Sequence, residues 1–92
     1  MTETMPARIE RLLRARFEPQ HFKLRDDSAK HVGHAGASSG GGHYSVLIVS
    51  SMFEGMNRLE RHRQVYAALG ALVGAEIHAL AIQAIAASEW SS

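Results

Sequence analysis

The chain has 92 residues, of which 46% are hydrophobic, and its ten basic and nine acidic residues give a formal net charge of +1. This size and composition predict a single globular domain, residues 1–92, and the near-neutral charge gives no strong overall attraction to nucleic acid or to an anionic membrane. Because the sequence contains no cysteine, a disulfide scaffold and a thiolate metal site built by this chain alone are both excluded.

The first predicted element is an amphipathic helix over residues 5–17. Thr4 suits the position that caps a helix, and Pro19 disfavours helical geometry at Glu18. The apolar residues of this segment recur at helical spacing: Met5, Ile9, Leu12, Leu13 and Phe17. The segment therefore has one apolar face, as expected of a helix that packs on a core.

Two strands are predicted next, separated by a long loop. Residues 21–26 alternate, with Phe22 and Leu24 on one face, and residues 43–50 form the clearest strand of the sequence. The second strand is mostly apolar on both faces, which indicates a central position in a sheet. Residues 27–42 between the strands form a flexible, Gly-rich loop, and a loop this long in a small domain is more often functional or mobile than incidental.

A second helix and a third strand complete the predicted domain. Asn57 is placed to cap a helix that runs to about Val73, and Gly74 is placed to end it. Residues 77–82 form an apolar third strand, and Ser88 is placed to cap a short C-terminal helical turn. The order α-β-β-α-β predicts an α+β fold, a three-stranded mixed sheet with helices on one face.

His78 is the most informative residue because it interrupts the apolar third strand. A histidine in such a run is either satisfied by a hydrogen bond or used as a ligand or proton carrier. One interpretation is a core histidine bonded to the backbone or to Glu76, and the other is a metal ligand.

Further histidines lie in and beside the predicted loop. His31 and His34 are three residues apart, so their imidazoles could reach one metal ion, although both could equally be exposed polar residues. Together with His78 they could also form a zinc or nickel site without a partner. We interpret His43, which opens the second strand, as structural.

A basic cluster opens the second helix. Arg58, Arg61 and Arg63 could contact phosphates or base edges of a nucleic acid. The same residues could instead form a solvated face paired with Glu54 and Glu60, or a docking surface for an acidic protein. The sequence has no nucleophile elbow, zinc-protease motif or phosphate-binding loop, so we do not expect an enzyme.

Several segments of the chain resemble the BolA family over roughly residues 9–90. They are Gly42-His43-Tyr44, Phe53-Glu54-Gly55, Arg61-His62-Arg63-Gln64-Val65-Tyr66, Ile77-His78-Ala79-Leu80-Ala81-Ile82 and Glu89-Trp90. This resemblance implies a fold similar to the class II KH fold, with a helical turn added. It also implies an adaptor that binds a monothiol glutaredoxin in iron–sulfur trafficking or iron sensing. The alternative that it implies is a DNA-binding transcriptional regulator of stress response and cell shape.

The resemblance also implies roles for individual residues. His78 matches a histidine that ligates a [2Fe–2S] cluster shared with glutaredoxin and glutathione, and no cofactor is expected on the isolated chain. The second ligand would come from the loop, where His31 and His34 both remain open. The DNA-binding alternative would use Arg58, Arg61 and Arg63. We expect a cytoplasmic protein with no membrane association, a monomer or weak dimer when free.

Overall fold

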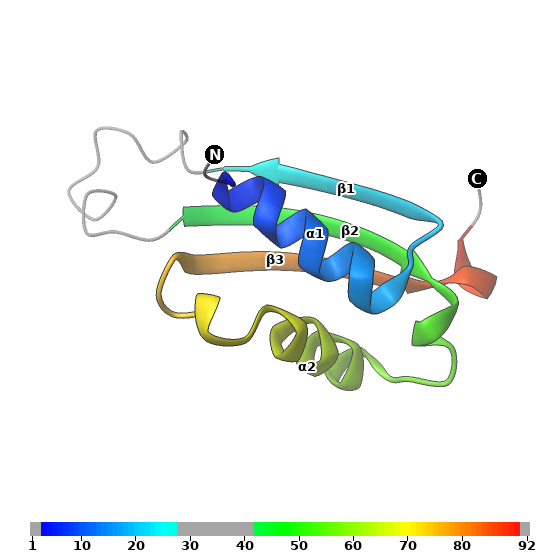
Figure 1. The fold of residues 1–92 in the computed structure, drawn as a ribbon. Helices are drawn as coiled ribbons and strands as arrows, with labels where there is room; N and C mark the ends of the chain where they lie inside the picture. The colour runs from blue at the N-terminus through cyan, green and yellow to red at the C-terminus, as the bar shows by residue number, and fades with distance from the viewer. Residues whose placement is uncertain (1–2, 28–41, 91–92) are drawn as a thin grey trace.

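The structure is a computed structural model that describes residues 3–27 and 42–90. Its elements, in chain order, are α1 (Met5–Phe17), β1 (His21–Asp26), β2 (Gly42–Ser50), the 3-10 turn η3 (Ser51–Phe53), α2 (Arg58–Leu69), the 3-10 turn η4 (Gly70–Leu72), β3 (Ile77–Ala86) and the 3-10 turn η5 (Ala87–Glu89) (Figure 1). The predicted α-β-β-α-β order is confirmed. Within the described ranges, no helix has the length and apolar character needed to cross a membrane.

The three strands form one mixed sheet in the order β1-β2-β3. β1 pairs antiparallel with β2, so that Phe22 lies opposite Ile48, and β2 pairs parallel with β3. β2 is therefore the central strand, as its apolar residues on both faces predicted.

Both helices lie on the same side of the sheet (Figure 1). The core between them and the sheet includes Ile9 and Leu13 of α1, Val65 of α2 and Ile48 of β2, all with no exposed surface. Phe17 and Phe53 pack against each other in this core with ring centroids 4.8 Å apart. No described helix covers the opposite side of the sheet, which we call the open face.

The first helix begins and ends where the sequence predicts. The Thr4 hydroxyl accepts a hydrogen bond from the Ala7 N–H at 3.3 Å, which satisfies one of the free donors of the first turn. The helix ends at Phe17 because Glu18 adopts a left-handed conformation, with φ of 44°, before Pro19.

The second helix is shorter than predicted. Asn57 caps it as expected, in a reciprocal pair of hydrogen bonds with Glu60. The helix ends at Leu69, however, because Gly70 has a φ of +58° and leaves the helical conformation. The predicted end at Val73 is therefore wrong, and Gly74, with a φ of +90°, is instead part of the turn into β3.

The third strand is longer than predicted, and the C-terminal turn begins differently. β3 continues from Ile82 to Ala86 because residues 83–86 pair with the last residues of β2. The prediction that Ser88 caps the final turn is wrong. The Ser88 N–H and hydroxyl both donate to the Glu54 carboxylate, at 2.8 and 2.7 Å, and Ala86 precedes the turn.

Candidate metal-ligating site

A bulge at the start of β3 decides where His78 points. Ile77 pairs with Gly42 of β2, but the next residue of β2, His43, pairs with Ala79, so that His78 is an extra residue in the ladder. Strict alternation from Leu80 and the other inward residues of β3 would turn His78 toward the helices. The bulge instead buries Ile77 and exposes His78. The interpretation of His78 as a core histidine is therefore wrong.

The exposed imidazole of His78 lies against a second imidazole. The rings of His43 and His78 have centroids 5.1 Å apart and planes inclined by 48°. We interpreted His43 as structural, and its position beside His78 makes it a further candidate ligand. Within the described residues, no group of three or more His, Asp or Glu side chains could hold a metal ion. The part of the site that the structure describes thus offers two imidazoles.

The ends of the segment that carries His31 and His34 lie at this end of the sheet. The Asp27 N–H donates to the His43 carbonyl, and the Gly42 N–H donates to the Glu76 carbonyl, both at 2.7 Å. His31 and His34 themselves lie outside the described residues, so their role as second ligand stays a prediction. The zinc or nickel site that these two histidines could form with His78 also stays a prediction.

Gly42 belongs to β2, although we assigned it to the loop, and its Cα lies close to the Tyr44 ring. A Cβ atom there would overlap the ring of Tyr44, two residues along the strand. Tyr44 is buried, and its burial and the Asp26 carboxylate raise the pKa of its phenol above the usual value. The Tyr44 ring thus packs in the core, on the opposite face of β2 from His43.

A polar network on the open face holds the strand end next to His43. The Arg25 guanidinium donates to the Asp27 carboxylate at 2.6 Å and to the Ser45 hydroxyl at 3.4 Å, and the Ser45 hydroxyl donates to the other Asp27 oxygen. Arg25 and Ser45 are partners across β1 and β2, so the network joins the end of β1 to the start of β2.

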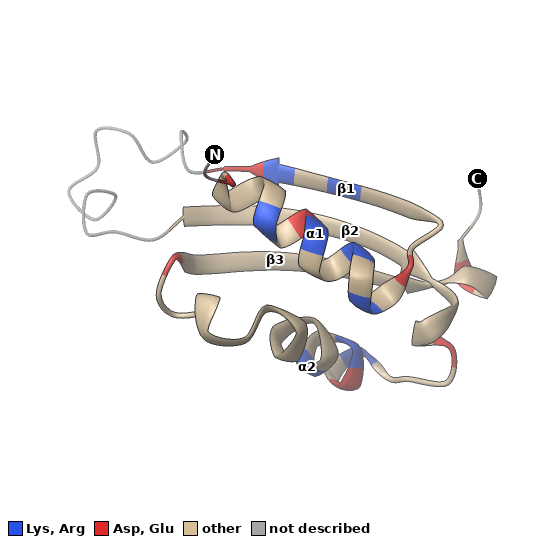
Figure 2. Ribbon diagram, in the orientation of Figure 1, with Lys and Arg blue, Asp and Glu red and all other residues tan. Residues whose placement is uncertain are grey.

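The arginines of the basic cluster lie in the first half of α2 (Figure 2), but their side chains have different surroundings. Arg61 donates to both carboxylate oxygens of Glu89, at 2.7 and 3.0 Å, and to the carbonyls of Met56 and Ala84. Its side chain is only 13% exposed. These contacts are internal, so the expectation that Arg61 contacts a nucleic acid is not supported by its geometry. Arg58 and Arg63 are exposed and make no ion pair within residues 3–27 and 42–90.

The Arg61–Glu89 pair has a clear electrostatic consequence. The hydrogen bonds from Arg61 and from the Ala86 N–H lower the pKa of the Glu89 carboxyl from its usual value near 4.5 to about 2. Since Glu89 follows β3 and Arg61 lies on α2, the charged pair joins the C-terminal turn to the helix.

Comparison with known proteins identifies close relatives along most of the chain. A family model described as BolA-like protein matches residues 13–89. BolA-like protein 1 of Mus musculus is 41% identical over 86 residues, a match that covers 89% of this chain and 61% of that protein. The DNA-binding transcriptional regulator BolA of Escherichia coli is 39% identical, with 90% of this chain and 76% of that protein covered. The chain thus spans less than two thirds of the mammalian relative.

Solved structures show the same fold. BolA1 from Arabidopsis thaliana superposes with a TM-score of 0.83 at 36% identity, covering 99% of this chain and 100% of that one. The BolA domain of SufE1 from the same organism gives a TM-score of 0.81 at 29% identity, covering 98% of this chain and 100% of that one.

Proposed function

Because the chain belongs to the BolA family, we propose that it is an adaptor that binds a monothiol glutaredoxin and shares with it the ligation of a [2Fe–2S] cluster. One observation carries this proposal. The bulge in β3 turns the imidazole of His78 out of the core and brings it beside His43. An adaptor acts by binding, and the role requires no catalytic residue.

The available side chains fit a shared cluster better than a cluster held by this chain alone. Two imidazoles can occupy two positions on one iron of a [2Fe–2S] cluster, and the remaining two positions require thiolates. The sequence has no cysteine, so those thiolates would come from the glutaredoxin and from glutathione. His78 would be one ligand, and His43, His31 or His34 the second. Bound there, the cluster would supply one-electron chemistry and a visible chromophore.

Neutral imidazoles also suit a cluster that is passed on or sensed. An imidazole ligates only when it is deprotonated, so protons compete with the metal for it. The exposure of His78 leaves it open to both solvent and a partner. The chain's own contribution is therefore to hold two imidazoles at a fixed strand end and to dock the protein that completes the site.

Co-expression with a monothiol glutaredoxin tests this function. The wild-type complex should purify coloured, with cluster bands in visible absorbance and circular dichroism, and His78→Ala should lose or strongly alter those bands. His62→Ala, at a histidine of α2 on the helix-covered side of the sheet, is the matched control and should keep them (Figure 1). An unchanged spectrum for His78→Ala would exclude His78 as a ligand.

A second candidate function is DNA binding, which the name of the Escherichia coli relative states for that protein. The observation that favours it is the exposure of Arg58 and Arg63 on one end of α2. Binding should weaken steeply with salt, and the double substitution Arg58→Ala and Arg63→Ala should weaken it further at every sequence tested. Absence of any mobility shift with duplex DNA at low salt would exclude this function.

A further inference from the structure

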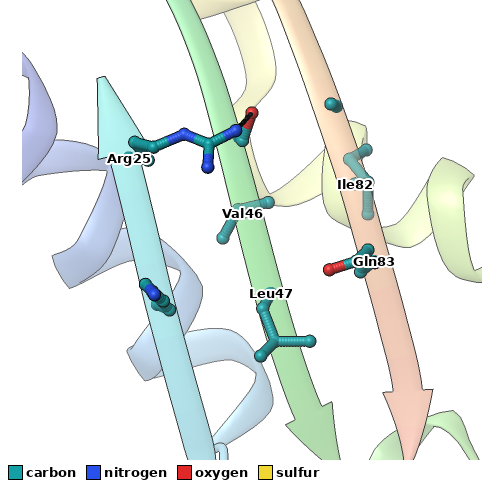
Figure 3. Close-up of a pocket in the computed structure, with 8 residues that line it drawn as sticks. Arg25, Val46, Leu47, Ile82 and Gln83 are labelled. Carbon is teal, nitrogen blue, oxygen red and sulfur yellow. Dashed lines mark hydrogen bonds between the residues drawn. The ribbon is translucent and has the colours of Figure 1, made fainter. Parts of the chain in front are cut away.

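The open face of the sheet carries a hollow at its centre. The hollow has a volume of about 460 Å³ and is lined by residues of all three strands (Figure 3). Arg25 of β1, Leu47 of β2 and Gln83 of β3 lie side by side across it (Figure 3). Lys23 of β1 and Ala81 of β3 also line the hollow, on either side of the central strand.

The lining combines an apolar floor with positive charge at one edge. Leu47 and Ala81 expose aliphatic surface, and among the described residues that line the hollow there is no carboxylate. The Arg25 guanidinium is held at the edge of the hollow by its hydrogen bonds to Asp27 and Ser45, and 62% of the side chain remains exposed. Lys23 is exposed and makes no ion pair within the described parts of the chain. Such a surface is complementary to an apolar side chain flanked by carboxylates.

The hollow is continuous with the imidazole pair. His43, Ser45 and Leu47 alternate along β2, so all three side chains emerge on the open face. Ala79, the partner of His43, and Ala81 follow the same alternation on β3. Successive side chains on one face of a strand are about 6.6 Å apart, so the hollow begins one such step from the imidazoles.

We propose that the open face, from the His43–His78 pair to Lys23 and Gln83, is the docking surface for the protein that completes the site. This inference depends on the proposed adaptor function and specifies where the glutaredoxin binds. A specific interface buries about 800 Å² on each partner, far more than two imidazoles present. A protein that supplies ligands at His78 must therefore cover neighbouring surface, and the hollow is surface next to the pair that no other described element covers.

Calorimetric titration with a cluster-free monothiol glutaredoxin tests this surface. Ala81→Glu places a carboxylate in the hollow and should weaken binding about tenfold or more, because the longer side chain fills the hollow and its charge repels the carboxylates expected on the partner. Lys23→Gln should weaken binding less and should reduce its dependence on salt. Ala7→Glu makes the same charge change on the exposed side of α1 and should bind within about twofold of wild type.

His78→Ala separates docking from ligation. It should weaken binding of the cluster-free glutaredoxin less than Ala81→Glu does, yet give no cluster spectrum. If Ala81→Glu and Lys23→Gln fold and bind like wild type, the open face is not the docking surface and the adaptor function stands. If wild type itself neither binds a glutaredoxin nor gains a cluster with one, the proposed function fails as well. If Ala81→Glu weakens only the binding of a single-stranded oligonucleotide, the occupant is a nucleic acid and the proposal is overturned.

Discussion

His43 and His78 come from neighbouring parallel strands, and their ring centroids lie 5.1 Å apart although the two residues are not paired in the ladder. Ala79 is the partner of His43, and His78 is the extra residue before it. The contact between the imidazoles therefore depends on a single inserted residue in β3.

Deletion of His78 tests whether this residue is an insertion that the sheet does not need. Removing the extra residue should leave Ile77 opposite Gly42 and Ala79 opposite His43, so the ladder becomes regular and the fold is retained. The amide spectrum of the deletion variant should match that of His78→Ala except around residues 76–80. Extensive spectral change throughout the sheet would contradict the bulge, because it would mean that the register of β3 depends on residue 78.

The order of elements could be predicted because local signals set it. The apolar spacing of α1, the Thr4 and Asn57 caps and the alternation of β1 and β2 all act within a few residues. The end of α2 was missed because Gly70, rather than Gly74, takes the positive φ that ends it. The extension of β3 was missed because residues 83–86 are extended through their pairing with β2, which overrides local preference.

The candidate site could be predicted only in part, for a related reason. The sequence singled out His78 as a histidine in an apolar strand, but alternation alone assigns it to the buried face. The bulge depends on the register between strands that are more than 30 residues apart, which no local pattern reports. The available signal for His43 was its alternation with Ser45 and Leu47, which assigns it to the open face once β2 is central.

Gly42→Ala should destabilise the protein by about 1–3 kcal/mol, because the new methyl group overlaps the buried ring of Tyr44. Urea denaturation of the single variant and of the pair with Tyr44→Ala forms a double-mutant cycle. In the Tyr44→Ala background the ring is gone, and the cost of Gly42→Ala should largely disappear. An equal cost in both backgrounds would show that the strain comes from the backbone at residue 42 and not from the ring.

Arg61→Ala should destabilise the protein and Arg63→Ala should not, although the two arginines are only two residues apart on α2. Arg61→Ala removes four internal hydrogen bonds and should lower the free energy of unfolding by about 1–3 kcal/mol. Arg63→Ala removes an exposed side chain and should change stability by no more than about 0.5 kcal/mol. If the protein binds DNA, Arg63→Ala should reduce the salt dependence of binding, which a thermal melt would not reveal.

The acid stability of the fold should depend on Glu89. The pKa of Glu89 is lowered from near 4.5 to about 2 in the folded protein, so its ion pair with Arg61 stabilises the fold fully above pH 4.5. As the pH falls from 4.5 to about 2, the unfolded chain takes up this proton before the folded one, and the contribution is lost. Glu89→Gln lacks this ion pair at every pH. The variant should therefore be less stable than wild type at pH 7, and the two stabilities should converge near pH 2. Urea midpoints measured across this range test the prediction. Glu76→Gln, an exposed carboxylate with no ion pair in the described residues, is the control and should follow the wild-type curve.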